Sequence, residues 1–174
     1  MKINSFLKLY ILISILFLSC HKEPQKILNE ITVSVGGKPN SIDPSKISSI
    51  NSMIYINHLF ENLTIKDENG NIIPGAAEKW ISSNNNTIYI FYIRTNAKWA
   101  DGFDLKADDF VYAWRRIVDP KTQSHLAVYL ENIKNAHEIM NGNMDKEELG
   151  VKALDNDILY VELEYPVPYF DELV

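Results

Sequence analysis

The chain has 174 residues, of which 46% are apolar, 23% charged and 11% aromatic. These proportions are typical of a globular protein and exclude a disordered or fibrous chain. The formal net charge is −6 and no Lys/Arg-rich run occurs, which argues against nucleic acid as a partner, because clustered cations are needed to neutralise phosphates. A single cysteine excludes an internal disulfide and a cysteine-based zinc cluster.

The first 19 residues have the order of a signal peptide. Lys2 and Lys8 supply a positive start, residues 9–18 are almost wholly apolar, and a small residue, Ser19, follows. The apolar run is about half of the roughly 20 residues that a membrane-spanning helix needs. We therefore expect a signal peptide over 1–19, with a permanent transmembrane anchor as the less favoured alternative.

The lone Cys20 directly follows this apolar run, and the arrangement resembles the lipobox of bacterial lipoproteins. In such proteins the cysteine is acylated and becomes the mature N-terminus, and more than one acyl chain holds the protein firmly. Phe17 stands where the lipobox usually has Leu. We expect lipidation of Cys20, with 20–30 as lipidated cysteine and polar tether. The alternative is an ordinary exported protein with a stray cysteine.

The next segments alternate between strand, helix and turn patterns. Residues 31–35 alternate and predict a strand, and the apolar spacing over 50–63 predicts a helix. Turn residues at 67–71 predict a hairpin. A second hairpin is expected around 82–86, and its later strand, 87–93, is so apolar that we expect burial on both faces.

The second half adds two helices and a pair of strands. Residues 107–118 form an amphipathic pattern with acidic residues in the first turn, and 131–140 predict a shorter helix. Strands are expected at 151–154 and 158–163, and 166–174 begin a further element. The order predicts an α/β protein of mixed α+β type, in which a mixed sheet with hairpins is flanked by helices.

No catalytic or metal-binding constellation is found in the sequence. His137 and Glu138 begin like a metalloprotease helix, but Asn141 stands where the second histidine should be. Neither a Gly-x-Ser-x-Gly elbow nor a Walker-type loop occurs. The aspartates between 101 and 109 do not have calcium-loop spacing and fit a turn and a helix start. We expect no enzyme activity, no catalytic residues, no metal and no cofactor.

Several stretches in a fixed order resemble the peptide- and nickel-binding family of ABC importer solute-binding proteins, family 5, most closely its oligopeptide-binding members. The motifs are Ser-Ile-Asp-Pro at 41–44, Leu-Phe-Glu-Asn-Leu at 59–63, Pro-Gly-Ala-Ala-Glu-Lys-Trp at 74–80, and the stretches 92–102, 107–116, 149–155 and 166–170.

The resemblance implies an N-terminal lobe portion of a bilobed, class C periplasmic binding protein fold, with 31–174 as an incomplete solute-binding domain. Family members are roughly three times as long. They close over an extended peptide, hold it through backbone hydrogen bonds, and deliver it to a permease of the inner membrane. Partners would therefore be oligopeptides, an ABC permease and, through the lipid, the membrane, on the periplasmic side or at the cell surface.

The resemblance also suggests ligand-binding residues. The loop 46–50 aligns with a pocket-lining loop, so Ser48 and Ile50 are candidates, and Leu126 stands near a position where relatives carry Tyr. Ser48 replaces a Glu, which predicts a pocket less attractive to basic side chains. Lys106 replaces the usual Thr before the helix at 107, which should weaken its start.

Three functional hypotheses follow. The first is a peptide-binding lipoprotein of an oligopeptide importer, of which this chain carries one part and would bind poorly alone. The second is a surface lipoprotein that serves as an interaction module without transport. The third, an exported enzyme, is disfavoured by the missing nucleophile, base and metal patterns.

Overall fold

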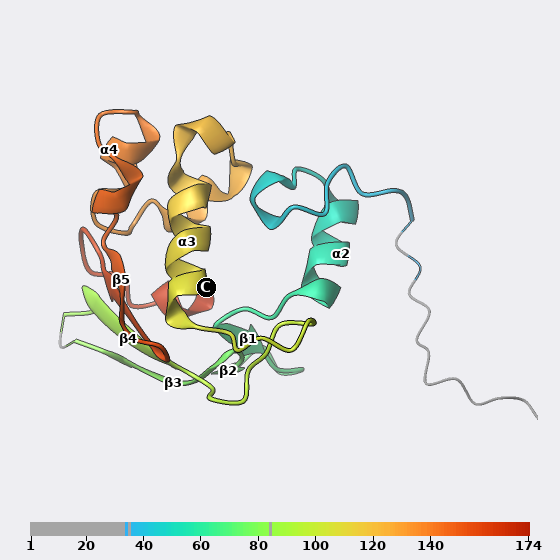
Figure 1. The fold of residues 1–174 in the computed structure, drawn as a ribbon, viewed down its shortest axis with the longest axis horizontal. Helices are drawn as coiled ribbons and strands as arrows, with labels where there is room; N and C mark the ends of the chain where they lie inside the picture. The colour runs from blue at the N-terminus through green and yellow to red at the C-terminus, as the bar shows by residue number, and fades with distance from the viewer. Residues whose placement is uncertain (1–33, 35, 84) are drawn as a thin grey trace, which may run out of the picture. The chain divides into compact units, whose positions relative to one another are not determined.

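Four antiparallel strands form the main sheet of this protein, and a short hairpin lies beside it. The computed structural model describes residues 34, 36–83 and 85–174 (Figure 1). The main sheet has the order β3-β4-β6-β5. The strands are β1 (Thr64–Lys66) and β2 (Ile72–Pro74) in the hairpin, and β3 (Ala77–Ser82), β4 (Ile88–Ile93), β5 (Val151–Asp155) and β6 (Ile158–Glu162) in the main sheet.

Helices and 3-10 turns occupy the segments between the strands. The helices are α2 (Ile50–Leu59), α3 (Ala107–Val118) and α4 (Ala136–Met140). The turns are η1 (Pro44–Lys46), η2 (Pro120–Thr122), η3 (His125–Leu130), η4 (Lys146–Glu148) and η5 (Phe170–Glu172). Within the described residues, no helix has the length and apolar character needed to cross a membrane.

The core lies between α3 and one face of the main sheet. Alternate residues of β4 point into it, and Tyr89, Phe91 and Ile93 are almost completely buried. Phe170, from the last segment of the chain, packs against Tyr89 with 5.2 Å between the two ring centroids. Its ring also lies edge-on to Trp114. The further element expected at 166–174 is therefore η5, and its aromatic side chain completes the core.

The expectation that β4 is buried on both faces is wrong. Ile88, Ile90 and Tyr92, which alternate with the buried residues, are only half-buried. The reason is that α3 packs against the sheet from one side, as Figure 1 shows for α3 and β5. An apolar run therefore does not prove that both faces of a strand are covered.

The start of α3 is better stabilised than its sequence predicts. Lys106 offers no side-chain cap, as expected, but the Asp109 carboxylate accepts a hydrogen bond from the Lys106 backbone N–H at 2.9 Å. The same carboxylate accepts one from the indole nitrogen of Trp99 at 3.0 Å. Half of a capping box thus replaces the missing Thr.

The predicted helix at 50–63 is shorter in the structure and ends at Leu59. Residues 60–63 are not helical, because the backbone leaves the helix axis at Phe60 to meet the start of β3. The Leu63 carbonyl accepts hydrogen bonds from the N–H groups of Gly75 and Ala77, at 3.1 and 3.0 Å. A side chain at Gly75 would collide with the Asn62 carbonyl at 2.5 Å, so this close approach requires glycine.

The predicted helix at 131–140 is also shorter, because only its second half is helical. Ile133 forms an isolated bridge with Leu163, and the Lys134 N–H donates to the Glu162 carbonyl at 2.9 Å. Asn135 then adopts a left-handed conformation with φ of 67° before α4 begins. Pairing with the end of β6 therefore overrides the helical propensity of this segment.

The other expected elements of the main domain are present. Both early hairpins, α3 and the β5–β6 pair are confirmed, and so is the α+β class. Every pairing among the described strands is antiparallel. A mixed sheet also needs a parallel pairing, and none occurs among these strands. Short turns join most partners, and such turns enforce antiparallel pairing. The strand expected at 31–35 and the signal peptide lie outside the described residues.

Replacing Phe91 by Ala should lower the free energy of unfolding by about 3–5 kcal/mol, because it empties a fully buried site between the sheet and α3. Urea denaturation followed by circular dichroism measures this change. The matched control is Phe103→Ala, since Phe103 is 73% exposed and its removal should cost less than about 0.5 kcal/mol. Equal losses in the two variants would contradict the position of the core.

Candidate functional site

A loop rich in small polar residues, 40–52, precedes and opens α2. Its centre is Ser52, whose side chain is fully buried. The Ser52 hydroxyl accepts hydrogen bonds from the backbone N–H groups of Asn40 and Ser41, at 3.0 and 3.3 Å. It also lies 2.6 Å from the Asn40 side-chain oxygen, to which it donates. This network gives the loop one defined conformation without an apolar core of its own.

The predicted residues Ser48 and Ile50 lie at the exposed tip of this loop. The Asn40 side-chain amide donates to the Ser48 hydroxyl at 3.0 Å. Ser49 caps α2, because its hydroxyl accepts the Ser52 N–H at 3.2 Å. Ile50, the first residue of α2, is 81% exposed, and Ile42 nearby in the loop is 62% exposed. This part of the loop therefore exposes two apolar side chains, the Ser48 hydroxyl and the cation of Lys46.

The third predicted residue, Leu126, is half-buried in η3. Its backbone N–H donates to the Ser124 hydroxyl at 3.2 Å, which starts this turn. The turn η1, which ends two residues before Ser48, packs against η3. The structure thus brings together two segments that are about 80 residues apart, and both carry predicted ligand-binding residues.

An ion pair between Asp43 and Arg116 holds η1 on α3. The guanidinium donates to both carboxylate oxygens, at 2.7 and 2.5 Å. The same carboxylate caps η1 by accepting the Ser45 N–H at 3.1 Å. Each side chain is 31% exposed. This bidentate geometry is the strongest form of the Arg–carboxylate contact, so Arg116 is a positioning residue for the loop.

The electrostatics of this pair favour its charged form. The Arg116 guanidinium, through its hydrogen bonds to the carboxylate, lowers the pKa of Asp43 below its ordinary value of 3.8, and the Ser45 N–H adds to the effect. Partial desolvation opposes both. Asp43 raises the pKa of Arg116 in return. The contact is therefore fully formed at neutral pH.

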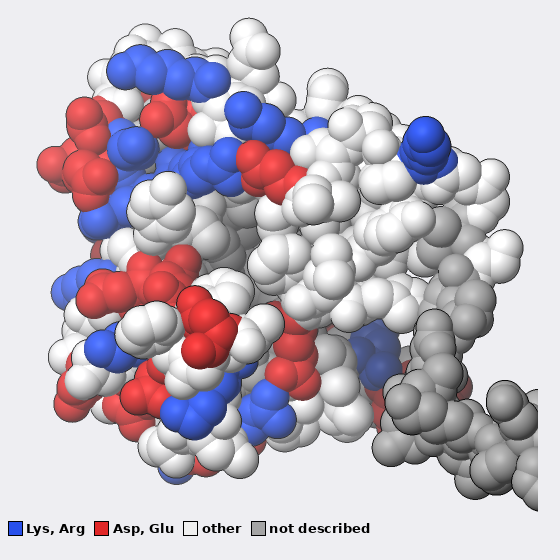
Figure 2. Space-filling view, turned by 45° about the vertical axis from the view of Figure 1, so that its right-hand side comes forward, with Lys and Arg blue, Asp and Glu red and all other residues white. Residues whose placement is uncertain are grey.

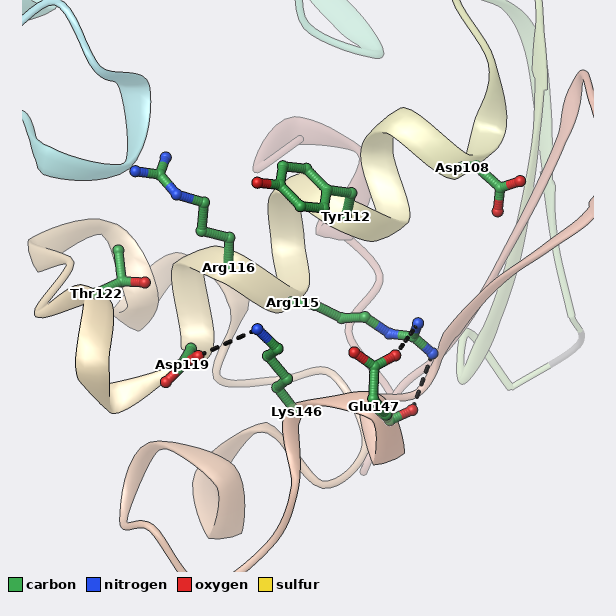
Figure 3. A pocket seen from close by; sticks show the side chains of 8 residues that line it. All are labelled: Asp108, Tyr112, Arg115, Arg116, Asp119, Thr122, Lys146 and Glu147. Atoms are coloured by element: carbon green, nitrogen blue, oxygen red, sulfur yellow. Dashed lines mark hydrogen bonds and ion pairs between the residues drawn. The ribbon is translucent and has the colours of Figure 1, made fainter.

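A hollow of about 490 Å³ opens beside the same face of α3 (Figure 3). Its cations are already paired: Arg115 binds Glu147, and Lys146 lies 3.3 Å from Asp119. The backbone N–H of Lys121, followed by Lys146, lowers the pKa of Asp119. Tyr112 and Thr122 complete the wall. Since positive and negative charges balance, this hollow does not select strongly for an ion of either sign.

The two sides of this region differ in charge. Figure 2 shows charged side chains of both signs crowded over the part that holds α3 and η4, whereas the part that holds η1 and α2 is mostly uncharged. In the described part of the chain, no group of three or more His, Cys, Asp or Glu side chains has the geometry to hold a metal ion. A mostly uncharged surface with a few oriented polar groups is compatible with binding of a solute.

The profile of bacterial extracellular solute-binding proteins, family 5 (middle region), matches residues 71–174. The chain belongs to this family. Members of the family are binding proteins and not enzymes, as the sequence predicted. The match includes the main sheet, α3 and η3.

Curated relatives of the chain include periplasmic peptide-binding proteins and a probable deoxycholate-binding periplasmic protein of Escherichia coli, YgiS, which is 41% identical over 138 residues. The periplasmic murein peptide-binding protein MppA of Escherichia coli is 42% identical over 146 residues, which cover 83% of this chain and 27% of that protein. The periplasmic oligopeptide-binding protein OppA of Salmonella typhimurium is 43% identical over 141 residues, covering 80% and 26%. The chain thus spans about a quarter of the length of the relatives that it matches.

Solved structures of the family have the same fold over this region. MppA in its unliganded open form superposes with a TM-score of 0.75 at 44% identity, covering 78% of this chain and 26% of that one. OppA of Haemophilus influenzae in complex with the peptide RPPGFSPFR gives 0.76 at 38% identity, covering 78% and 27%. The expected fold, part of the bilobed family 5 architecture, is therefore confirmed.

Sequence reasoning found the loop and η3 but missed the ion pair that holds the loop on α3. Asp43 and Arg116 both stand in motifs that carry the resemblance, yet they are 73 positions apart, and no spacing rule links such residues. Ser52 was also missed, because a serine in an apolar helical pattern looks like a solvent-facing residue. The binding roles of Ser48, Ile50 and Leu126 remain predictions, and Cys20 lies outside the described residues.

Replacing Asp43 by Asn should destabilise the protein at pH 7 by about 1 kcal/mol, since Arg116 loses its charged partner. Because the folded-state pKa of Asp43 is lowered, its stabilisation is present above the ordinary pKa and is lost as the pH falls through the folded value. The difference in the free energy of unfolding between wild type and variant, measured by urea denaturation, should therefore shrink from about pH 5 downward. In the control Asp157→Asn, the gap should be small at every pH. A constant gap for Asp43→Asn would contradict the ion pair.

Proposed function

We propose that this chain is part of the peptide-binding lipoprotein of an ABC oligopeptide importer, and that the loop 46–50 with η3 forms one wall of its peptide site. The observation that carries this proposal is the Asp43–Arg116 pair, which holds the loop on α3, so that η1 packs against η3, the turn that contains Leu126. Relatives that bind murein peptide and oligopeptides support the choice of ligand.

The wall has chemistry that suits a variable peptide. Exposed Ile42 and Ile50 offer apolar contact, and Ser48 offers one neutral hydroxyl. Peptides of many sequences share their backbone groups, so a site that relies on backbone contacts accepts a broad range. The exposed charge of this loop is that of Lys46, which does not attract basic side chains. Since Ser48 is uncharged, basic peptides should gain no special advantage here. The rest of the site would come from regions of the relatives that this chain does not match.

The proposal includes export and anchoring. Residues 1–19 would act as the signal peptide, Cys20 would carry the lipid, 20–30 would form the tether, and 31–174 would belong to the solute-binding domain. The anchored protein would face the periplasm or the cell surface and pass its peptide to a permease of the inner membrane. The periplasmic relatives support an exported protein, and the Ser19-Cys20 junction after the apolar run supports the anchor.

Cells that express the full chain and are fed an alkyne-bearing fatty acid should label it, because Cys20 would be acylated. Cys20→Ala should abolish the label and shift the protein from the membrane fraction to the soluble or precursor fraction. Ser19→Ala, which keeps a small residue before the cysteine, should be labelled like wild type. Label that persists without Cys20 would refute lipidation at this residue.

Peptide binding can be tested residue by residue with ¹⁵N-labelled protein from His21 to Val174. A tri-lysine peptide should shift the amide resonances of Ser48, Ile50 and Leu126, with weak affinity because only one wall is present. Ser48→Glu should tighten binding of this peptide about two- to fivefold, as expected for one exposed ion pair.

The matched control is Ser82→Glu at the exposed end of β3, which should leave the affinity unchanged. A tri-alanine peptide should bind wild type and Ser48→Glu alike, since it has no basic side chain. Shifts confined to other surfaces, or an equal effect of both glutamates, would overturn the assignment of this wall.

A further inference from the structure

The face of the main sheet turned away from α3 carries a compact apolar centre. This outer face is built from Ile90 and Tyr92 of β4 and from Ile158 and Tyr160 of β6, with Lys79 and Asp155 at two of its corners. In the register of the sheet, Tyr92 lies opposite Ile158 and Ile90 lies opposite Tyr160. The four central side chains are half-buried, although no helix is seen to pack on them among the described residues.

The edges of the outer face are more exposed than its centre. Ile81 of β3 is 52% exposed, and Lys152 and Asp155 of β5 are also exposed. The ammonium group of Lys79 lies over the Tyr92 ring, 4.6 Å from its centroid, and that of Lys152 lies 4.7 Å from the centroid of Tyr160. Both lysines thus fold over the rings with their ammonium groups partly in water. Contiguous apolar surface of this kind marks an interaction site more often than isolated exposed residues do.

The charges at the corners have a specific order. Across the four strands, Lys79 pairs with Tyr92, Tyr92 with Ile158, and Ile158 with Asp155. One row of the outer face therefore begins with a cation and ends with an anion, with an aromatic and an aliphatic residue between them. The next row runs from Ile81 through Ile90 and Tyr160 to Lys152.

Consider a two-fold axis that lies above the outer face, parallel to the strands and midway between β4 and β6. Rotation about this axis places a second copy face to face with the first, so that each row lies over the same row of the second copy in reverse order. Two copies facing each other about this axis place Lys79 of one over Asp155 of the other, and Tyr92 over Ile158. In the second row Ile90 meets Tyr160, and Ile81 meets the aliphatic stem of Lys152. Such self-complementarity is what an isologous interface requires, and aligned sheets commonly pack face to face in this way.

We propose that the outer face is a homodimer interface, in which a second copy of this chain packs sheet on sheet. The charge order selects this occupant. A purely anionic surface would be repelled at the Asp155 corner, and a cationic one at Lys79 and Lys152, whereas a second copy places Lys79 over Asp155 at both ends. Within one copy, the Lys79 ammonium lies 4.0 Å from a Glu78 carboxylate oxygen, a contact loose enough to allow a second anionic partner. Opposite charges at the corners also fix the register of the two sheets.

The interface is small, so the association should be weak. Four strands about 4.8 Å apart and five residues long give a projected face of roughly 300 Å², well below the roughly 800 Å² per partner of a stable complex. We expect a dissociation constant of about 10–500 µM for the free chain. If the lipid anchor proposed above is present, copies held in one membrane plane would meet at a higher effective concentration.

Sedimentation equilibrium of the chain from His21 to Val174, which lacks the acylated cysteine, tests the proposal. Wild type should show a monomer–dimer equilibrium. Lys79→Glu and Asp155→Lys should each raise the dissociation constant about tenfold or more, because like charges then face each other at both ends of the interface. The double variant Lys79→Glu with Asp155→Lys should restore it to within about threefold of wild type.

The control Lys121→Glu, an exposed position in η2, should leave the dimer unchanged, and circular dichroism verifies that every variant is folded. A wild type that stays monomeric at about 1 mM, or single variants that dimerise like wild type, would overturn the proposal. So would a double variant without rescue. Binding of the wild-type chain to phosphatidylglycerol vesicles that is lost in Tyr160→Ser would assign the outer face to a membrane instead. None of these results depends on peptide binding.

Discussion

Among the described residues, a helix covers the main sheet on one side only, and this constraint shapes the rest of the described structure. The core needs a large apolar surface on the covered side, and it obtains one from the alternate residues of β4 and β6 together with Trp114 and Phe170. The Tyr89 hydroxyl, buried in the same layer, donates to the Val167 carbonyl at 2.7 Å and so ties the last segment to the sheet. The other side of the same strands is the outer face, whose apolar side chains are available for the proposed contact with a second copy.

The candidate site depends on this layer through α3. One side of the helix packs on the sheet, and the other side presents Arg116 to Asp43. The loop that carries Ser48 therefore takes its position from a helix that belongs to the core, and within the loop Ile47 is a buried apolar side chain. A binding wall supported in this way is rigid where the ligand would lie and polar where it meets the helix. This arrangement suits a member of a family whose task is to hold a solute rather than to change it.

The sequence predicts the parts of this structure that depend on local pattern. The amphipathic helix at 107–118, the hairpins and the β5–β6 pair all follow from periodicity and turn residues. The errors occur where distant strands compete for a segment: residues 60–63 leave the helix to bond with Gly75 and Ala77, and residues 133–134 pair with the end of β6. The one-sided burial of β4 and the Asp43–Arg116 contact also depend on tertiary packing, which single-sequence patterns do not contain. The motifs of the family located the loop and η3, but not the ion pair that holds the loop on α3.

The length of chain between Asp43 and Arg116 has a consequence for the order of folding. The contact closes a segment of 73 residues, so the loop 40–52 cannot reach its final position until α3 exists. An exported chain crosses the membrane from its N-terminus, so this loop would emerge long before the helix that holds it. Its hydroxyl network can form early, because its partners are near in sequence, but its docking comes late. If the chain is exported as proposed, a chaperone or protease that meets it during secretion would encounter this loop while it is still undocked.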